Sequence, residues 1–218
     1  MDLNYYIDSA ERGEVTDLLA TGLFRGVTTN PAILDKAGLG SIDIPDVIRW
    51  ATDAGAERVF VQAWGETADD MIELGRQFRQ ISGNVVVKLP YSLEGIVAAR
   101  SLGEDGEVLV TAVHSDAQVL PIVLARATFL APFVGRMDQA GRDGLDAALS
   151  MQRALQGLET STRLLAGSLR QPDQVLQLAQ AGVSHFTMAP AVWRLFFDDD
   201  VTRAAVENFQ RLASRAPR

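Results

Sequence analysis

Short apolar runs rich in β-branched residues recur eight times along this chain, and the segments between them carry apolar residues at helical spacing. Parallel strands covered on both faces read as continuous apolar runs, and they need crossover connections, usually helices, between them. The alternation therefore predicts an α/β fold built on a parallel sheet. The expected strands are residues 3–7, 26–29, 59–62, 85–88, 108–113, 128–131, 164–166 and 185–188.

The connecting segments carry start and stop signals of helices. Thr67 is followed three residues later by Asp70, which is a capping box of the aspartate-ended kind, and apolar residues continue from there at helical spacing. Pro172 stands where the first turn of another helix would begin, and Gly182 would end that helix. Beyond the eighth strand, residues 201–213 form a helical pattern that closure of a sheet does not require.

The positions of polar residues favour a closed barrel over an open sheet. An open, doubly wound sheet should carry a glycine-rich phosphate loop after its first strand, but residues 8–12 contain no glycine. In a barrel, side chains at the carboxyl ends of all strands converge on one mouth. We therefore expect a single (β/α)8 TIM barrel domain over residues 1–218 with an extra C-terminal helix, compact for a fold of roughly 250 residues. The polar strand ends are Asp8, Thr28, Asn30, Gln62, Lys88, Thr111, Arg136, Ser168 and Arg170.

Composition and charge exclude several classes of function. The chain has no cysteine, so thiolate metal sites, cysteine nucleophiles and disulfides are excluded, and a reducing cytoplasmic setting is expected. No apolar run approaches the length of a membrane span. The net charge of -8 disfavours nucleic acid as a partner. A small anionic ligand remains compatible with this charge, because a few positive groups can dominate the field inside a cleft.

Lys88 is the most informative single residue. The chain has only two lysines, Lys36 and Lys88, against eighteen arginines. Lys88 follows three valines in an expected buried strand, where an ammonium is costly and its pKa should fall. Only lysine can form an imine with a carbonyl substrate, whereas arginine would serve an ion pair equally well. The structural alternative is a strand-end lysine that reaches solvent or pairs with Asp8.

The other polar strand ends suit a polyol bound beside that amine. Asp8 could move protons during carbinolamine formation and carbon–carbon cleavage, or it could simply cap the helix after the first strand. The neutral side chains could bind sugar hydroxyls or an ordered water, or they could close turns. These neutral residues are Thr28, Asn30, Gln62 and Thr111.

Two arginines and a serine follow the sixth and seventh strands. Arginine matches phosphate oxygens with two hydrogen bonds, and barrels often hold phosphate near strands seven and eight. Arg136, Ser168 and Arg170 are therefore candidate phosphate ligands, although they could also be surface residues in an arginine-rich chain.

The chain shows no metal-ligand pattern. His114 and His185 belong to no metal-ligand spacing, and we interpret both as structural. The acidic run at 198–200 is interpreted as a solvated helix cap with no function. No metal and no cofactor are expected.

With these residues identified, the chain resembles the short-chain transaldolases and fructose-6-phosphate aldolases over its whole length. The resemblance implies Lys88 as the Schiff-base lysine and Asp8 as the proton-transfer carboxylate. It also implies a homo-oligomer, a pentamer or decamer, in which the last helix packs on a neighbouring subunit. The motifs that carry the resemblance are 6–9 (YIDS), 26–31 (GVTTNP), 86–90 (VVKLP) with 94–95 (EG), and 131–138 (APFVGRMD).

The resemblance assigns the remaining site residues as well. Thr28 and Asn30 would contact the dihydroxyacetone portion of the substrate, and Gln62 and Thr111 would hold the catalytic water. The phosphate ligands would be Arg136, Ser168 and Arg170.

Several positions depart from one or the other branch of this family. Phe133 is transaldolase-like, because the aldolases have a tyrosine there, whereas Gln62, Leu109 and Ala131 are aldolase-like. His114 replaces an aromatic Phe or Tyr, and Asp116 replaces a small residue, so the acceptor side is expected to differ.

The resulting functional hypothesis is a class I aldolase acting on a ketose phosphate such as fructose 6-phosphate. The dihydroxyacetone enamine on Lys88 would be transferred to an aldose phosphate or released. The rival hypotheses are a non-catalytic barrel that binds a sugar phosphate as a regulator, and a metal-dependent aldolase or isomerase.

Overall fold

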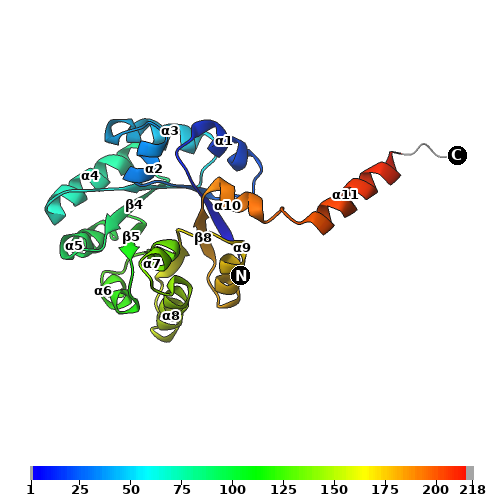
Figure 1. The fold of residues 1–218 in the computed structure, drawn as a ribbon. Coiled ribbons are helices and arrows are strands. Elements are labelled where there is room, and N and C mark those ends of the chain that lie inside the picture. The colour runs from blue at the N-terminus through cyan, green and yellow to red at the C-terminus, as the bar shows by residue number, and fades with distance from the viewer. Residues whose placement is uncertain (1, 215–218) are drawn as a thin grey trace.

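A computed structural model describes residues 2–214, and within them eight parallel strands form a closed barrel in sequence order, with helices on its outside (Figure 1). Each strand pairs in parallel with the next, and the eighth pairs with the first. The prediction of a (β/α)8 barrel is confirmed, although residues 1 and 215–218 of the expected domain lie outside the described residues. The strands are β1 (Asn4–Asp8), β2 (Gly26–Thr28), β3 (Arg58–Gln62), β4 (Val85–Pro90), β5 (Val108–Val113), β6 (Phe129–Pro132), β7 (Arg163–Ala166) and β8 (His185–Met188).

The helices follow the strands, with a few additional short helices in the loops. The predicted capping box opens α4, where the Thr67 hydroxyl accepts from the Asp70 N–H and the Asp70 carboxylate accepts from the Thr67 N–H. Pro172 is the first residue of its helix, as predicted. The helices are α1 (Arg12–Ala20), α2 (Pro31–Lys36), α3 (Ile44–Asp53), α4 (Ala68–Ile81), α5 (Leu93–Leu102), α6 (Val119–Leu124), α7 (Val134–Gln139), α8 (Gly144–Gly157), α9 (Pro172–Gln180), α10 (Pro190–Leu195) and α11 (Asp200–Ala213), with 3-10 turns at Ser41–Asp43 and Asp116–Gln118.

The barrel wall separates two apolar cores. A small core fills the barrel interior, and a larger one lies between the strands and the surrounding helices. In β4, Val86 belongs to the interior core, and Val85 and Val87 belong to the outer one. Because side chains alternate along a strand, Lys88 faces the same side as Val86, one step nearer the carboxyl end. The interior residues are Tyr6, Phe60, Val86, Leu109, Phe129, Ala131 and Leu165.

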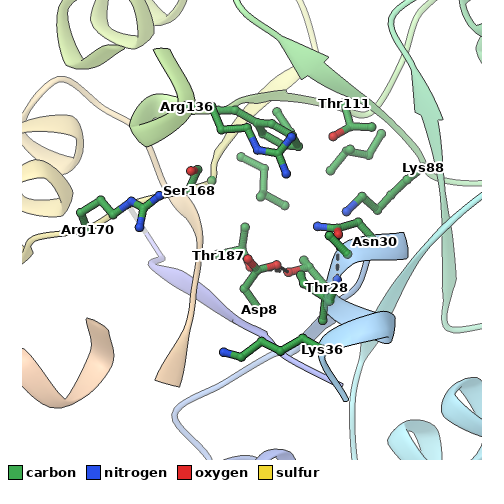
Figure 2. Close-up of a pocket in the computed structure, with 17 residues that line it drawn as sticks. Asp8, Thr28, Asn30, Lys36, Lys88, Thr111, Arg136, Ser168, Arg170 and Thr187 are labelled. Carbon is green, nitrogen blue, oxygen red and sulfur yellow. Dashed lines mark hydrogen bonds between the residues drawn. The ribbon is translucent and has the colours of Figure 1, made fainter. Parts of the chain in front are cut away.

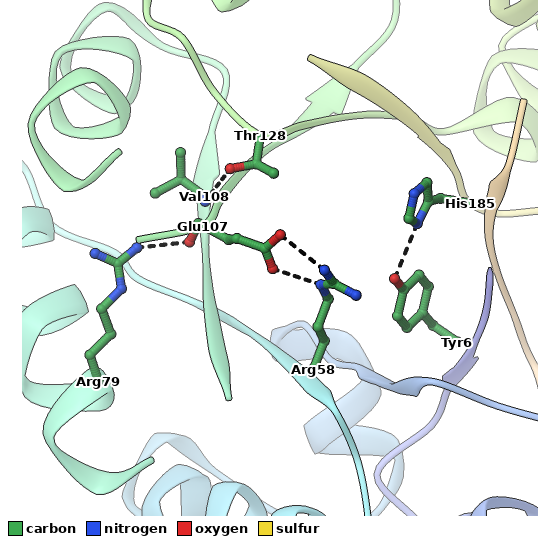
Figure 3. A network of polar contacts seen from close by, with 7 residues as sticks. All are labelled: Tyr6, Arg58, Arg79, Glu107, Val108, Thr128 and His185. Carbon is green, nitrogen blue, oxygen red and sulfur yellow. Dashed lines mark hydrogen bonds and ion pairs between the residues drawn. The ribbon is translucent and has the colours of Figure 1, made fainter. Parts of the chain in front are cut away.

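Buried and partly buried polar side chains close the amino end of the barrel (Figure 3). The Tyr6 hydroxyl and His185 Nδ1 are hydrogen-bonded at 3.1 Å. Arg58 donates twice to the Glu107 carboxylate, at 2.6 and 3.1 Å, and Arg79 donates to the Glu107 carbonyl at 2.7 Å. Burial lowers the pKa of His185 to about 4, and the positive charges of Arg163 and Arg58 act in the same direction. His185 is therefore a neutral structural histidine, as the sequence indicated.

The last helix extends away from the barrel (Figure 1). The predicted helix over 201–213 is present as α11, which begins one residue earlier. Its apolar side chains are exposed, Phe209 at 66% and Leu212 at 51%, and no α11 residue is buried. That this helix packs on a neighbouring subunit stays a prediction.

Acid should weaken the fold through His185. The folded-state pKa of about 4 lies below the ordinary 6.5, so the unfolded chain binds the extra proton between these values. The stabilisation is complete above about pH 6.5 and is lost as pH falls towards about 4, by at most about 3 kcal/mol for a shift of this size. We expect His185→Gln to flatten the pH dependence of the unfolding free energy in this window, measured by denaturant titration. An equally steep slope in the variant would assign the acid sensitivity to other groups.

Candidate active site

A cavity of about 220 Å³ opens at the carboxyl end of the barrel (Figure 2). It brings together side chains from β1, β2, β4 and β5 and from the segments after β2, β6 and β7, so residues far apart in the sequence face one space. Nine of the ten predicted site residues line it: Asp8, Thr28, Asn30, Lys88, Thr111, Phe133, Arg136, Ser168 and Arg170. The convergence expected of a barrel mouth is therefore present, while the role of each residue stays a prediction.

Gln62 is the predicted residue that does not line this cavity. It lines a neighbouring cavity of about 380 Å³ together with Thr29 and Trp64. Asn30 lines both cavities, and the Gln62 and Lys88 backbones are paired in register. The carboxyl end of β3 is thus near the site, and Asn30 lies where the two cavities adjoin.

Lys88 combines burial with a fixed position for its amine. Its side chain is 5% exposed, and its Nζ donates a hydrogen bond of 2.5 Å to the carbonyl of Thr29. Burial lowers the pKa of Lys88 to about 8, and the negative charge of Asp8 opposes this shift. At pH 7 about one amine in ten is then unprotonated, compared with about one in three thousand at the ordinary pKa of 10.5. The amine can act as a nucleophile near neutral pH.

Asp8 is held by a chain of two threonine hydroxyls. Thr28 Oγ1 donates to Asp8 Oδ1 at 2.6 Å, and the hydroxyls of Thr28 and Thr187 lie 2.5 Å apart. Because Thr28 uses its only hydroxyl proton on Asp8, Thr187 donates to Thr28. Burial raises the pKa of Asp8, while Lys88, the Thr28 hydrogen bond and Arg136 oppose the rise. The carboxyl group is thereby poised to take up and return a proton.

Thr187 lines the cavity but is not among the site residues predicted from the sequence. It lies in β8, one residue before the strand ends, and its side chain is 6% exposed. The same rule that selected the other strand ends, a polar residue in an apolar run near the carboxyl end, would have found it.

A bulge in β5 places Thr111 at the cavity. The register with β6 shifts between Val110 and Val113, and Ala112 has a φ of 61°, in the left-handed region. Bulges of this kind re-aim side chains beside active sites. The Thr111 hydroxyl is buried, and within residues 2–214 it has no hydrogen-bond partner. It is free to bond a ligand in the cavity.

Gly135 allows the segments after β6 and β7 to approach closely. Its N–H donates to the Ser168 carbonyl at 2.9 Å, and a Cβ at position 135 would lie 2.5 Å from that oxygen and 2.8 Å from Arg170 Nε. Ser168 itself has a φ of 59°. The guanidinium of Arg136 lies 5.0 Å from the centre of the Phe133 ring, a cation–π contact. These contacts orient the candidate phosphate ligands towards one side of the mouth.

His114 does not line the cavity but packs against Phe133, which does. Its ring packs edge-on against Phe133 at 5.8 Å, and its carbonyl accepts from Arg142 at 3.1 Å. Asp116 accepts from Ser150 at 3.0 Å and does not line the cavity. Of these two residues, His114 therefore contacts the cavity lining through Phe133, whereas Asp116 is bonded to Ser150 away from it.

The cavity also contains a cation that the sequence reading did not assign. Lys36, the last residue of α2, lines the cavity, so both lysines of the chain meet there. Because Lys36 lies on a helix and not at a strand end, the search for polar strand ends did not select it. Within the part of the chain that the structure describes, no three histidine or acidic side chains come together in a way that could hold a metal ion.

Comparison with known proteins identifies the family of this chain. The family model described as transaldolase/fructose-6-phosphate aldolase matches residues 5–217. The chain belongs to this family. A relative named probable transaldolase from Hyphomonas neptunium is 36% identical over 217 residues, covering 98% of each chain. Relatives with the same name from Cereibacter sphaeroides and Novosphingobium aromaticivorans are each 34% identical, covering 95% of this chain and 94% of theirs.

Membership confirms the resemblance found in the sequence and supports an enzyme of the transaldolase family. Among residues 2–214, no helix is both long enough and apolar enough to cross a membrane.

Filling the space at Gly135 should weaken phosphate binding. In Gly135→Ala the new Cβ must displace the Ser168 carbonyl or the Arg170 side chain. We expect the affinity for glycerol 3-phosphate, which cannot form an imine, to fall about tenfold, as for the loss of one charge-assisted hydrogen bond. Calorimetric titration measures this. Gly157→Ala is the matched control, because a Cβ there meets no atom within 4 Å. Equal affinities in both variants would contradict the assignment of this side of the mouth to phosphate.

Proposed function

We propose that this protein is a Schiff-base aldolase of the transaldolase type, acting on the C3–C4 bond of a ketose phosphate such as fructose 6-phosphate. The observation that carries the proposal is the buried amine of Lys88, whose pKa is lowered to about 8, across a polar cavity from the partly buried carboxyl group of Asp8. A desolvated lysine beside an acid–base group is the arrangement that imine catalysis requires.

The reaction begins at the ketone. The unprotonated Nζ of Lys88 attacks the C2 carbonyl carbon to form the carbinolamine. Protonation of the carbinolamine hydroxyl by Asp8, through the bound water, lets it leave as water, which gives the iminium and leaves Asp8 as the carboxylate. Asp8 then removes the proton from the C4 hydroxyl, the C3–C4 bond breaks, and its electron pair neutralises the iminium nitrogen as an enamine. An aldehyde leaves, and Asp8 holds the proton. Addition of a new aldehyde reverses these steps, and water then releases the new ketose and regenerates the amine.

The neutral residues supply hydrogen bonds to the donor portion. Asn30 Oδ1 accepts from the Ile33 N–H at 3.0 Å and so caps α2, which leaves the Nδ2 donors for a substrate hydroxyl. Capping and substrate binding are therefore compatible. The free hydroxyl of Thr111 would bind the water used in dehydration and hydrolysis, whereas Gln62, which lines the neighbouring cavity, is not assigned to this water. The lining by Arg136, Ser168 and Arg170 supports phosphate recognition at the other side.

Transfer is proposed as the favoured outcome over release of dihydroxyacetone. Release needs a proton on the enamine carbon, and Phe133 offers no hydroxyl to deliver one. The relatives' names, probable transaldolase, support the same choice. Gln62, Leu109 and Ala131 are the aldolase-like features that weigh against it. Steady formation of free dihydroxyacetone from fructose 6-phosphate without an added aldehyde would overturn transfer as the main reaction.

Borohydride trapping tests the imine directly. After incubation with fructose 6-phosphate and borohydride, we expect a covalent adduct by intact-mass spectrometry and, by peptide mapping, its location at Lys88. Lys88→Arg should lose the adduct. Lys36→Arg, which removes the other side-chain amine at the cavity and keeps a cation there, should retain it. An adduct at Lys36, or none with several ketoses, would refute the mechanism, and the latter result would favour the non-catalytic sugar-phosphate barrel.

The pH dependence of trapping should follow Lys88. Because its pKa is lowered to about 8, the rate of imine formation should rise with pH up to that value and then level off, instead of rising towards 10.5. In Asp8→Asn the negative charge that raises the Lys88 pKa is gone, so the inflection should move to lower pH while trapping persists. Cleavage of the C3–C4 bond should fall about 10²- to 10⁴-fold, the usual contribution of a general base. An inflection that moves upwards would contradict this coupling.

A further inference from the structure

The mouth of the cavity concentrates positive charge in an acidic protein. Four basic side chains line it, against Asp8 as the acidic one, while the whole chain has a net charge of -8. The four are Lys36, Lys88, Arg136 and Arg170. Elsewhere many arginines pair with carboxylates, as Arg58 does with Glu107. Lys36, Arg136 and Arg170 are not paired in this way. Within residues 2–214, none of these three side chains lies within 4.0 Å of a carboxylate oxygen.

Lys36 lies across the cavity from the two arginines (Figure 2). It ends α2, which follows β2, whereas Arg136 lies in α7 after β6. In a closed barrel of eight strands in sequence order, β2 and β6 are on opposite sides. Arg170 follows β7, next to Arg136. Positive charge therefore faces the opening from both sides.

A purely structural role for Lys36 is the interaction of its charge with the carboxyl end of α2. Such a contribution is modest, about 0.3–1 kcal/mol in exposed helices. The last carbonyls of α2 already have backbone partners, because the Ala37 N–H donates to Ile33 and Leu34 and the Gly38 N–H donates to Asp35. This role also does not require the side chain to line the cavity, which it does.

We propose that Lys36 is a specificity-determining residue that favours phosphorylated substrates over neutral ones through its charge. A cleft with low-dielectric walls focuses the field of the charges that line it and raises the local concentration of an oppositely charged substrate. The side chain is exposed, so it acts as a mobile charge at the opening and not as a fixed phosphate ligand. The inference rests on the proposed aldolase chemistry for its kinetic readout.

The kinetic test uses one donor at a saturating concentration and two acceptors that differ in charge. With fructose 6-phosphate as the donor, the apparent kcat/KM is measured for erythrose 4-phosphate and for erythrose. For Lys36→Gln we expect a loss of about fivefold with the phosphorylated acceptor at low salt, as for one unit charge several ångströms from a dianion in water, and no loss with the neutral acceptor. The loss should shrink to less than about twofold at roughly 0.5 M salt, because screening removes it.

Two further variants distinguish the charge of residue 36 from the shape of its side chain and from the net charge of the protein. Lys36→Arg should restore discrimination, because it restores the charge. Arg126→Gln, which removes an exposed cation from the loop before β6 at the opposite end of the barrel, should leave it unchanged. Equal losses with both acceptors, failure of arginine to restore discrimination, or the same loss in Arg126→Gln would overturn the proposal.

A binding measurement keeps the proposal testable without catalysis. Glycerol 3-phosphate carries the phosphate but no carbonyl, so calorimetric titration reports anion binding alone. We expect Lys36→Gln to weaken this binding about fivefold at low salt and Lys36→Arg to restore it. If the parent protein formed no adduct and no product, the proposed function would fail while this titration still decided the role of Lys36. Unchanged binding in Lys36→Gln would overturn it.

Discussion

The burial of one amine beside one carboxyl group is the constraint on which the site depends. A lone ammonium inside the barrel would be too costly, and a full ion pair would leave the amine protonated and unreactive. The structure lies between these limits. Lys88 keeps a carbonyl partner in Thr29, and Asp8 is hydrogen-bonded to Thr28. Both pKa shifts have burial as their largest cause. The closed barrel supplies this burial from every side.

The barrel and its lysine could be predicted from the sequence because local chemistry determines them. Continuous valine runs such as 85–87 are compatible with strands covered on both faces, and a lysine after such a run must be explained by chemistry or by a charge partner. The convergence of Asp8, Thr28 and Arg136 followed from topology alone, since parallel strands place their carboxyl ends together.

What could not be predicted depends on loop geometry and on side-chain direction. Lys36 lies on a helix of six residues whose orientation after β2 is set by packing, so its position in the sequence gave no sign of the cavity. Gln62 occupies a strand end as expected, yet it lines the neighbouring cavity, which also contains Thr29 and Asn30. The left-handed conformation of Ala112, which re-aims Thr111, has no signal in a residue that rarely adopts it.

Both lysines of the chain line one cavity, and its other cationic side chains are arginines. Reagents that acylate or reductively alkylate amines usually decorate a protein at many surface lysines. Here the only side-chain amines line the candidate active site, and guanidinium groups do not react under the same conditions. Apart from reaction at the α-amino group, amine-directed labelling therefore becomes a probe of that cavity. The same property makes lysine-based immobilisation a poor choice for this protein, because attachment at a lysine would take place through the candidate active site.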